Sequence, residues 1–294
     1  MLKKRVVFLL FSFLIVVSFP VLAQQKEQRS YKKEKRIEKK SKTKTSRKFR
    51  KYKTKEEKFE AAKMYYSKGS YLTASQLLEE IYPLYLGTEK GDSILFLFAS
   101  SYYRNADYLI AAFYFNDFLR KYPQSPRAED AAFYRAKAYY LNSPDYNLDQ
   151  TDTYLAKENL EMFANYYPKG EHIEEVNVML DSVRNKLALK DFSIAMMYYR
   201  TKNYKSAQIA FQNLMKDYAD SKYVEEALFI MMKNNYEYAM KSVEAKKLER
   251  FQMVIDVKNK LKAKYPTSPY LAEAEKISNE VEKRMAKLIA EKNN

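Results

Sequence analysis

The stretch LFLFASSYYRNADYLIAAFYFNDFLRKYP, residues 95–123, decides the fold. Its apolar residues recur at helical spacing in two runs, which a polar turn at Asn105, Ala106 and Asp107 separates. The first run is Leu95, Phe98, Ala99 and Tyr102, and the second is Ala111, Phe115, Phe118 and Tyr122, followed by the helix-ending Pro123. Two helices of about 15 residues with a short link fold back as an antiparallel pair. Such a pair cannot bury both apolar faces alone, so we expect further copies.

The same pattern of small and large residues recurs along the chain. In the first helix a small residue lies three positions before an aromatic one, and in the second a small residue precedes large apolar residues by four and seven positions. Four copies carry their first small residue at Ala62, Ala99, Ala136 and Ala195, and a looser fifth copy ends at Pro266. The chain has only four glycines and no alternating runs of β-branched residues, so the sequence predicts an all-α protein.

Helix–turn–helix units of about 34 residues with these offsets resemble the tetratricopeptide repeat. The sequence therefore predicts a right-handed α-solenoid of about five such helix pairs. Repeats 1–3 occupy residues 56–168, with an insertion of eight residues near 142–152, and repeats 4–5 with a polar terminal helix occupy residues 169–294. A long helical run over residues 171–200 lies between the two groups, where we expect a bend.

The first 23 residues have the features of a secretory signal peptide. Three basic residues precede an apolar run from Val6 to Val17, and Val21, Leu22 and Ala23 form a cleavage site. The apolar run is shorter than the roughly 20 residues that cross a membrane as a helix. We therefore expect export and cleavage after Ala23.

The net charge of +16 is concentrated near the amino terminus. Residues 26–55 hold 16 Lys or Arg and three Glu, whereas the chain from residue 56 onward holds 34 basic and 34 acidic residues. An exported chain whose folded part is neutral is not expected to bind nucleic acid. Residues 24–55 contain few large apolar groups, so we expect a disordered tail. Two roles stay open for this tail: peripheral contact with anionic membrane lipids, or a solvated linker.

No catalytic residue, cofactor site or metal site is predicted. The chain has no cysteine and one histidine, His172, and it lacks a glycine-rich phosphate loop and a nucleophile motif. Scattered carboxylates on helical repeats are ordinarily solvated. We therefore expect a binding protein rather than an enzyme, with an envelope hydrolase as the alternative from the enzyme class.

The insertion resembles a calcium-binding loop only in part. Asp145, Asn147 and Asp149 alternate like the ligands of such a loop, but the sixth position is not glycine and the twelfth is not glutamate. The sequence therefore argues against calcium here. We expect Thr151 or Asp152 to cap the following helix instead.

Tyrosine doublets mark the first helix of four repeats. The first member of each doublet occupies a predicted core position, and the second points about 100° around the helix, toward an edge or the concave face. The second members are Tyr66, Tyr103, Tyr140 and Tyr199. Tyrosine offers a large rigid contact area with a polar tip, so these four are the candidate protein-binding residues. Packing between repeats is the alternative use.

The chain resembles the BamD family of outer membrane protein assembly factors. The resemblance is carried by YLIAAFYF at 108–115, SPDYNLDQT at 143–151 and YKSA at 204–207, and it covers residues 56–282. It implies a non-enzymatic scaffold in the assembly and insertion of β-barrel outer membrane proteins. Its partners would be the barrel-assembly protein, bound by the carboxy-terminal repeats, other assembly-machine subunits, and unfolded outer membrane proteins, bound by the amino-terminal repeats.

Members of this family usually carry a lipid on a cysteine at the mature amino terminus. This chain has no cysteine, so we expect a periplasmic protein that associates peripherally with the outer membrane without a lipid anchor. A general periplasmic scaffold that coordinates cell-envelope or peptidoglycan processes is the alternative function.

Overall fold

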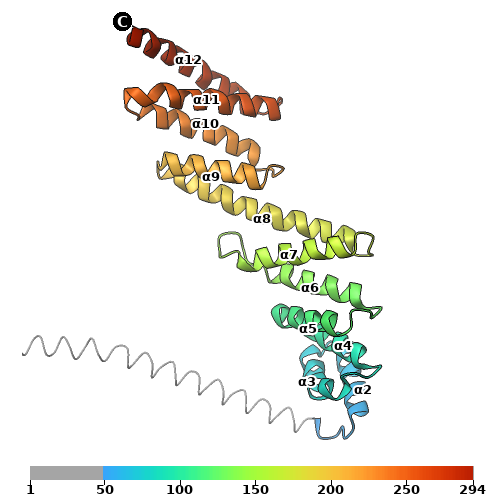
Figure 1. Cartoon of the computed structure of the whole chain (residues 1–294). Helices are drawn as coiled ribbons and strands as arrows, with labels where there is room; N and C mark the ends of the chain where they lie inside the picture. The colour runs from blue at the N-terminus through green and yellow to red at the C-terminus, as the bar shows by residue number, and fades with distance from the viewer. Residues whose placement is uncertain (1–48, 294) are drawn as a thin grey trace, which may run out of the picture. The chain divides into compact units, whose positions relative to one another are not determined.

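The computed structural model describes residues 49–293, and every regular element among them is helical (Figure 1). The elements are α2 (Lys55–Ser67), α3 (Tyr71–Ile81), the 3-10 helix η1 (Tyr82–Tyr85), α4 (Gly91–Arg104), α5 (Tyr108–Lys121), α6 (Ala128–Asn142), α7 (Thr151–Tyr166), α8 (Ile173–Arg200), α9 (Tyr204–Asp217), α10 (Val224–Met240), α11 (Glu244–Lys264) and α12 (Leu271–Asn293). No strand occurs between residues 49 and 293, and the predicted all-α class is confirmed.

The chain divides into two compact units at the turn between Asn105 and Ala106. In the described part of the first unit, α3 packs against both α2 and α4, around a core that includes Ala62, Leu78 and Phe98. The two helices predicted from residues 95–123 are confirmed as α4 and α5. Because they belong to different units, their packing as an antiparallel pair stays a prediction.

The second unit contains α5 to α12, and each of these helices packs against the next one along the chain. The small residues Ala136, Ala156, Ala195 and Ala207 are completely buried, as expected where neighbouring helices approach closely. Large residues from successive helices fill the space between them and form one continuous core. Its largest fully buried members are Phe163, Phe211 and Phe251.

A residue with left-handed backbone geometry lies in four of the helix–helix turns, one of them Gly87 between α3 and α4. Gly69 has φ +74°, and Ala106 and Lys202 take nearly the same angle, with φ 64° and 59°. In two of these turns the following residue closes the helix end, since Ser70 N donates to Tyr65 O and Asn203 N donates to Tyr198 O, both at 2.9 Å. The turn geometry therefore repeats even where the chain does not supply glycine.

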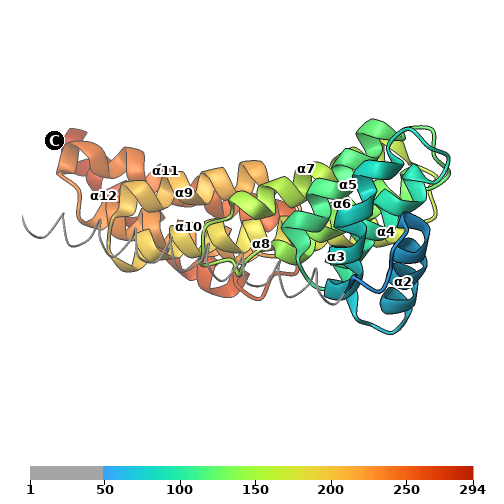
Figure 2. The ribbon, with the colours of Figure 1, turned by 90° about the horizontal axis from the view of Figure 1, so that it is seen from below.

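Helix α8 is exceptionally long, with 28 residues. Phe192 is the counterpart of Phe133 in the repeat, yet it lies 14 residues further from the start of its helix than Phe133 does. At 1.5 Å per residue, this displaces the α9–α12 group by about 21 Å along α8 relative to the α5–α7 group. Figures 1 and 2 show α8 reaching from one group to the other.

The signal peptide predicted at 1–23 and most of the basic tail predicted at 24–55 lie outside the described residues. Phe49, the first described residue, is only 2% exposed, so the chain is already packed before α2 starts at Lys55. Among residues 49–293, none of the helices combines the length and the apolar character that crossing a membrane requires.

Candidate functional site

Five helices, α2, α4, α6, α8 and α10, each carry a phenylalanine and, seven positions later, a tyrosine. The five pairs are Phe59/Tyr66, Phe96/Tyr103, Phe133/Tyr140, Phe192/Tyr199 and Phe229/Tyr236. Seven positions are two helical turns, so both side chains lie on one face of the helix. The tyrosines include all four candidates predicted from the sequence, and they add Tyr236.

In the second unit, these tyrosines connect α6 to α8, α8 to α10 and α10 to α12. The hydroxyl of Tyr140 on α6 lies 3.1 Å from Ser182 Oγ on α8, and that of Tyr199 on α8 donates to Glu237 Oε1 on α10 at 2.9 Å. The hydroxyl of Tyr236 on α10 donates to Glu280 Oε1 on α12 at 2.8 Å. The phenol groups therefore form a ladder of hydrogen bonds across α6, α8, α10 and α12.

The phenylalanines of the pairs extend the same ladder through ring stacking. Phe133 stacks on His172 at a centroid distance of 3.9 Å, and Phe229 stacks on Tyr270 at 4.7 Å. His172 immediately precedes α8, and Tyr270 immediately precedes α12. The single histidine therefore serves packing between α6 and α8, and its Nε2 also bonds Asp130 Oδ1 at 3.0 Å.

The four predicted contact residues lie on four different helices, Tyr66 and Tyr103 in the first unit and Tyr140 and Tyr199 in the second. Tyr66 makes an edge contact with Tyr71, with ring centroids 5.2 Å apart, and Tyr103 is half-buried. Tyr140 and Tyr199 are also half-buried and bridge neighbouring repeats through their hydroxyls. The doublet pattern did not identify Tyr236, because Asn235 and not a tyrosine precedes it. Phe229, seven positions earlier, is the sequence signal that identifies Tyr236.

Two lysines of α8 hold the inserted loop. Lys186 Nζ donates to Ser143 Oγ at 2.8 Å and to its carbonyl at 3.3 Å. Lys190 Nζ donates to the carbonyls of Asn147 and Leu148 at 3.2 and 2.9 Å. Burial lowers the pKa of Lys186. Ammonium groups therefore occupy the carbonyl-rich side of the loop that superficially resembles a calcium site.

The start of α7 is organised differently from the sequence prediction. The N-cap position of α7 is Gln150, not Thr151 or Asp152, and its side chain makes no capping hydrogen bond. Asp149 Oδ1, one residue earlier, accepts from the N–H of Thr151 at 3.0 Å. The buried Gln150 donates to the carbonyls of Asp145 and Leu148 at 2.8 and 3.0 Å and closes the loop. Among residues 49–293, no cluster of three or more His, Cys, Asp or Glu side chains is arranged to hold a metal ion.

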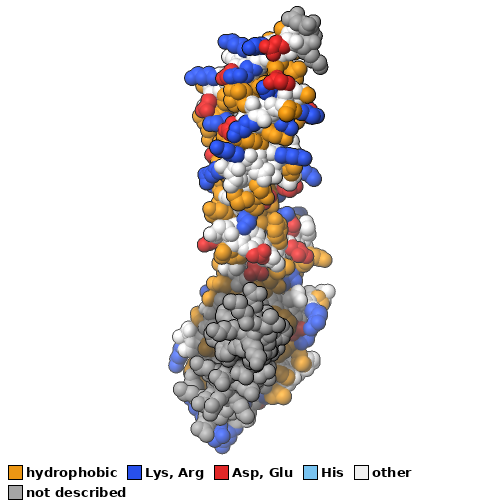
Figure 3. All heavy atoms as spheres, turned by 90° about the vertical axis from the view of Figure 1, so that its left-hand side faces the viewer, with side chains coloured by type: hydrophobic (Ala, Val, Ile, Leu, Met, Phe, Trp, Pro, Cys, Tyr) orange, Lys and Arg blue, Asp and Glu red, His pale blue; other side chains and the backbone are white. Residues whose placement is uncertain are grey.

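Exposed apolar side chains gather along one edge of the second unit. At this edge α6, α8 and α10 end and α7, α9 and α11 begin, and we refer to it as the turn edge. Its exposed large apolar residues are Leu141, Tyr146, Leu148, Tyr154, Met197, Met240 and Val243. Figure 3 views this edge: in its upper half, hydrophobic side chains run down the middle, and lysines and arginines lie on both flanks.

A cluster of aromatic and cationic groups lies at the turns α8–α9 and α10–α11. The rings of Tyr204 and Tyr238 stack at 6.1 Å, and the guanidinium carbon of Arg250 lies 3.7 Å from the centre of the Tyr238 ring. Glu237 accepts from the hydroxyls of both Tyr199 and Tyr204, at 2.9 and 3.0 Å. Burial and the Glu237 carboxylate raise the pKa of Tyr199 above its usual value. The cluster joins the tyrosine ladder to the turn edge.

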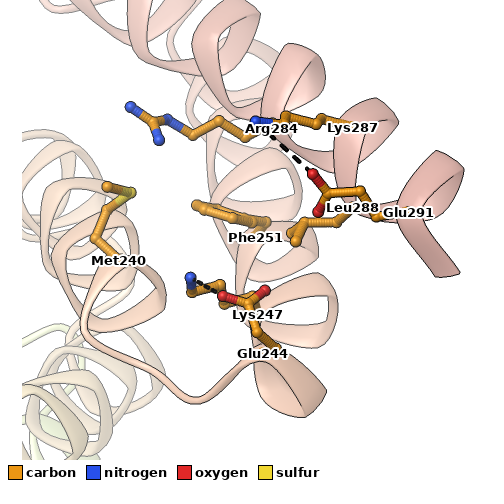
Figure 4. Close-up of a pocket in the computed structure, with 8 residues that line it drawn as sticks. All are labelled: Met240, Glu244, Lys247, Phe251, Arg284, Lys287, Leu288 and Glu291. Atoms are coloured by element: carbon orange, nitrogen blue, oxygen red, sulfur yellow. Dashed lines mark hydrogen bonds and ion pairs between the residues drawn. The ribbon is translucent and has the colours of Figure 1, made fainter.

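A pocket of about 200 Å³ adjoins this cluster, between the end of α10, the start of α11 and α12 (Figure 4). Met240, Phe251 and Leu288 form its apolar side, with Phe251 pointing between the other two. The charged residues around it are Glu244, Lys247, Arg284, Lys287 and Glu291. Lys247 pairs with Glu244, and Lys287 lies 3.7 Å from Glu291. Five of the eight residues around the pocket are charged, so an apolar floor is surrounded by ionic side chains.

Two carboxylates meet where α8 and α9 pack beside the start of α7. Burial, and secondarily the negative charge of Asp217, raise the pKa of Asp191. Burial also raises the pKa of Tyr218, whose hydroxyl bonds Tyr154. The ionised form of Asp191 is therefore less favourable in the folded protein than in the unfolded chain.

Replacing Asp191 with asparagine is expected to stabilise the protein at neutral pH. Because the folded pKa of Asp191 lies above the unfolded value, its favourable contribution is complete at low pH and is lost as the pH rises through the folded pKa. At pH 7 the variant should be more stable by about 1 kcal/mol or less, because the site is partly solvated. Urea unfolding at pH 7 and pH 3.5 checks this: the difference between variant and wild type should shrink at pH 3.5, and a constant difference would contradict it.

Comparison with known proteins places most of the helices in one family. A family model described as YfiO, outer membrane lipoprotein, matches residues 51–251, from just before α2 into α11. The outer membrane protein assembly factor BamD of Rickettsia prowazekii (strain Madrid E) is 27% identical over 90 residues. That match spans 31% of this chain and 36% of the length of the relative.

Proposed function

Because this chain belongs to the YfiO family of outer membrane lipoproteins, we propose that it is a non-enzymatic scaffold in the assembly of β-barrel outer membrane proteins. The observation that carries the proposal is the family match over residues 51–251, which includes the tyrosines of the ladder and most of the turn edge. The name of the Rickettsia relative, an outer membrane protein assembly factor, supports the same role.

The proposed architecture is a right-handed solenoid of five tetratricopeptide-like repeats. Repeats 1–3 would occupy residues 56–168, and repeats 4–5 with the terminal helix residues 169–294. The five phenylalanine–tyrosine pairs support this count, since each marks one first helix. The displacement along α8 supports a change of alignment between the third and fourth repeats.

The turn edge of the second unit is the surface we assign to the barrel-assembly protein. Apolar side chains at Met197, Met240 and Val243 supply contact area, and exposed cations such as Arg200 and Lys205 flank them. Aromatic and apolar anchors inside a polar rim are the usual composition of a protein interface. The partner surface that fits is apolar with acidic neighbours.

The amino-terminal repeats are proposed to bind unfolded outer membrane proteins. Tyr66 and Tyr103 lie on first helices of this part of the chain, and both are half-buried, so part of each ring remains accessible. The periplasm is the proposed location. The basic tail at residues 24–55 is proposed to contact the outer membrane peripherally, since the printed sequence contains no cysteine to carry a lipid.

Replacing Arg200 and Lys205 with glutamate is expected to reduce recovery of the barrel-assembly protein about tenfold. Reversing two charges on the flank of an interface slows association and places like charges opposite each other. The measurement is co-purification from gently solubilised envelopes, quantified by mass spectrometry. A matched control is the Lys169→Glu, Lys222→Glu variant, which makes the same charge change in exposed residues of the opposite turns.

The same experiment separates the proposal from its alternative. If the wild-type chain recovers peptidoglycan-associated proteins and no barrel-assembly protein, its function is that of a general cell-envelope scaffold. If both charge variants lose the barrel-assembly protein equally, the assignment of the turn edge is wrong.

A further inference from the structure

In the first unit, the turn between α3 and α4 exposes two leucines on either side of a buried tyrosine. Leu84 and Leu86 are 59% and 46% exposed, whereas Tyr85 is only 4% exposed. Pro83 and Gly87, which flank these three residues, are exposed as well. The turn therefore presents an apolar tip to its surroundings.

The tip is held in place by its buried centre. The hydroxyl of Tyr85 bonds Glu56 Oε1 at 3.3 Å, and its ring packs against Phe59 with centroids 6.4 Å apart. Thr88 closes the turn, because its hydroxyl and its N–H donate to the carbonyl of Tyr85 at 2.8 and 3.2 Å. The two leucines are thus fixed pointing outward, and contact with another surface requires no rearrangement of the turn.

The leucine turn is packed on the place where the basic segment enters the fold. Lys55 is the last cation of the basic segment 26–55 and the first residue of α2, and its Nζ lies 4.5 Å from the centre of the Tyr85 ring. Close to the turn, Glu80 of α3 is already paired with Lys58 of α2 at 2.6 Å. The sequence that precedes and enters α2 carries a large positive excess, with 16 Lys or Arg and three Glu over residues 26–55.

We propose that Leu84 and Leu86 insert into the surface of an anionic lipid bilayer to which the basic segment is attracted. This inference rests on the membrane contact proposed above for the basic tail. Sixteen cations along one chain segment match a continuous field of negative headgroups. Peripheral proteins commonly need two weak signals for stable membrane binding, and here the second signal is the apolar tip.

The test measures binding of the exported chain to vesicles by co-sedimentation at low salt. Wild type is expected to bind phosphatidylglycerol-containing vesicles and to leave pure phosphatidylcholine vesicles unbound. The Leu84→Ser, Leu86→Ser variant should bind the anionic vesicles about tenfold more weakly, and deletion of residues 26–48 should abolish salt-sensitive binding. The matched control is Leu72→Ser, because Leu72 is 52% exposed in the same unit but lies at the start of α3.

Three results would overturn the inference. The first is equal vesicle binding by wild type and the double leucine variant, and the second is an equal loss in Leu72→Ser. The third is a double leucine variant that binds vesicles as wild type does but no longer recovers the barrel-assembly protein in detergent. That result would make the turn a protein-docking site. Circular dichroism and thermal unfolding identify any variant that fails to fold. Failure of the assembly proposal is distinguishable, since wild type would then bind vesicles but recover no barrel-assembly protein.

Discussion

Replacing Phe211 with alanine is expected to lower the free energy of unfolding by about 3–5 kcal/mol. Phe211 lies on α9, is completely buried, and contacts Phe192 of α8 at a centroid distance of 6.4 Å. Truncation leaves a cavity between two helices that each belong to the central core of the second unit. Because repeats are stabilised mainly by their neighbours, the effect should spread to the adjacent helices.

Chemical denaturation followed by circular dichroism measures this loss. The control is Ile209→Ala on the same helix, where the side chain is 48% exposed and truncation should change stability by less than about 1 kcal/mol. A similar loss in both variants would show that helix propensity, and not packing between repeats, is responsible.

Replacing Glu237 with alanine is expected to cost about 2–4 kcal/mol of stability. The carboxylate accepts hydrogen bonds from Tyr199 and Tyr204, and bonds to a charged group contribute about 1.5–3 kcal/mol each. Tyr204 is 7% exposed, so its hydroxyl has little access to water as a replacement partner. The loss also loosens the contact between α8 and α10, so recovery of the barrel-assembly protein should fall with stability.

The control for this prediction is Glu280→Ala, which removes the exposed acceptor of Tyr236. Its effect should be below about 1 kcal/mol, because water can replace an exposed partner. Urea unfolding of both variants provides the comparison. Equal losses would mean that the half-buried double acceptor at Glu237 has no special role in joining α8 to α10.

The helices and their buried residues could be predicted because they depend on local periodicity. Ala136, Phe163 and Phe211 occupy the positions that the small and large pattern assigns to the core, and all three are buried. The apolar periodicity is less informative about packing where a helix is lengthened, as α8 is. The extra turns of α8 keep their helical pattern, but nothing local reveals which half packs with α7 and which with α9.

The contacts that build the candidate site depend on residues far apart in the sequence. Lys186 and Lys190 reach carbonyls of the inserted loop more than 40 positions earlier, and no local pattern identifies them. The stacking of Arg250 on Tyr238 could not be predicted from the sequence either. Tyr238 lies near the end of α10 and Arg250 lies in α11, so their contact depends on how the two helices pack. The tyrosine ladder could be predicted in part. The sequence pattern identifies its tyrosines, but it does not identify their hydrogen-bond partners.

The length of α8 has a consequence for how the second unit can be divided. In an ordinary array each repeat can be removed from an end, since its helices contact only their neighbours. Helix α8 packs against α7 and against α9, and its buried residues extend from Val176 to Ala195. A cut that preserves either group would strip half of this helix of its partner. Truncation and exchange of modules between relatives are therefore not expected to be tolerated across α8.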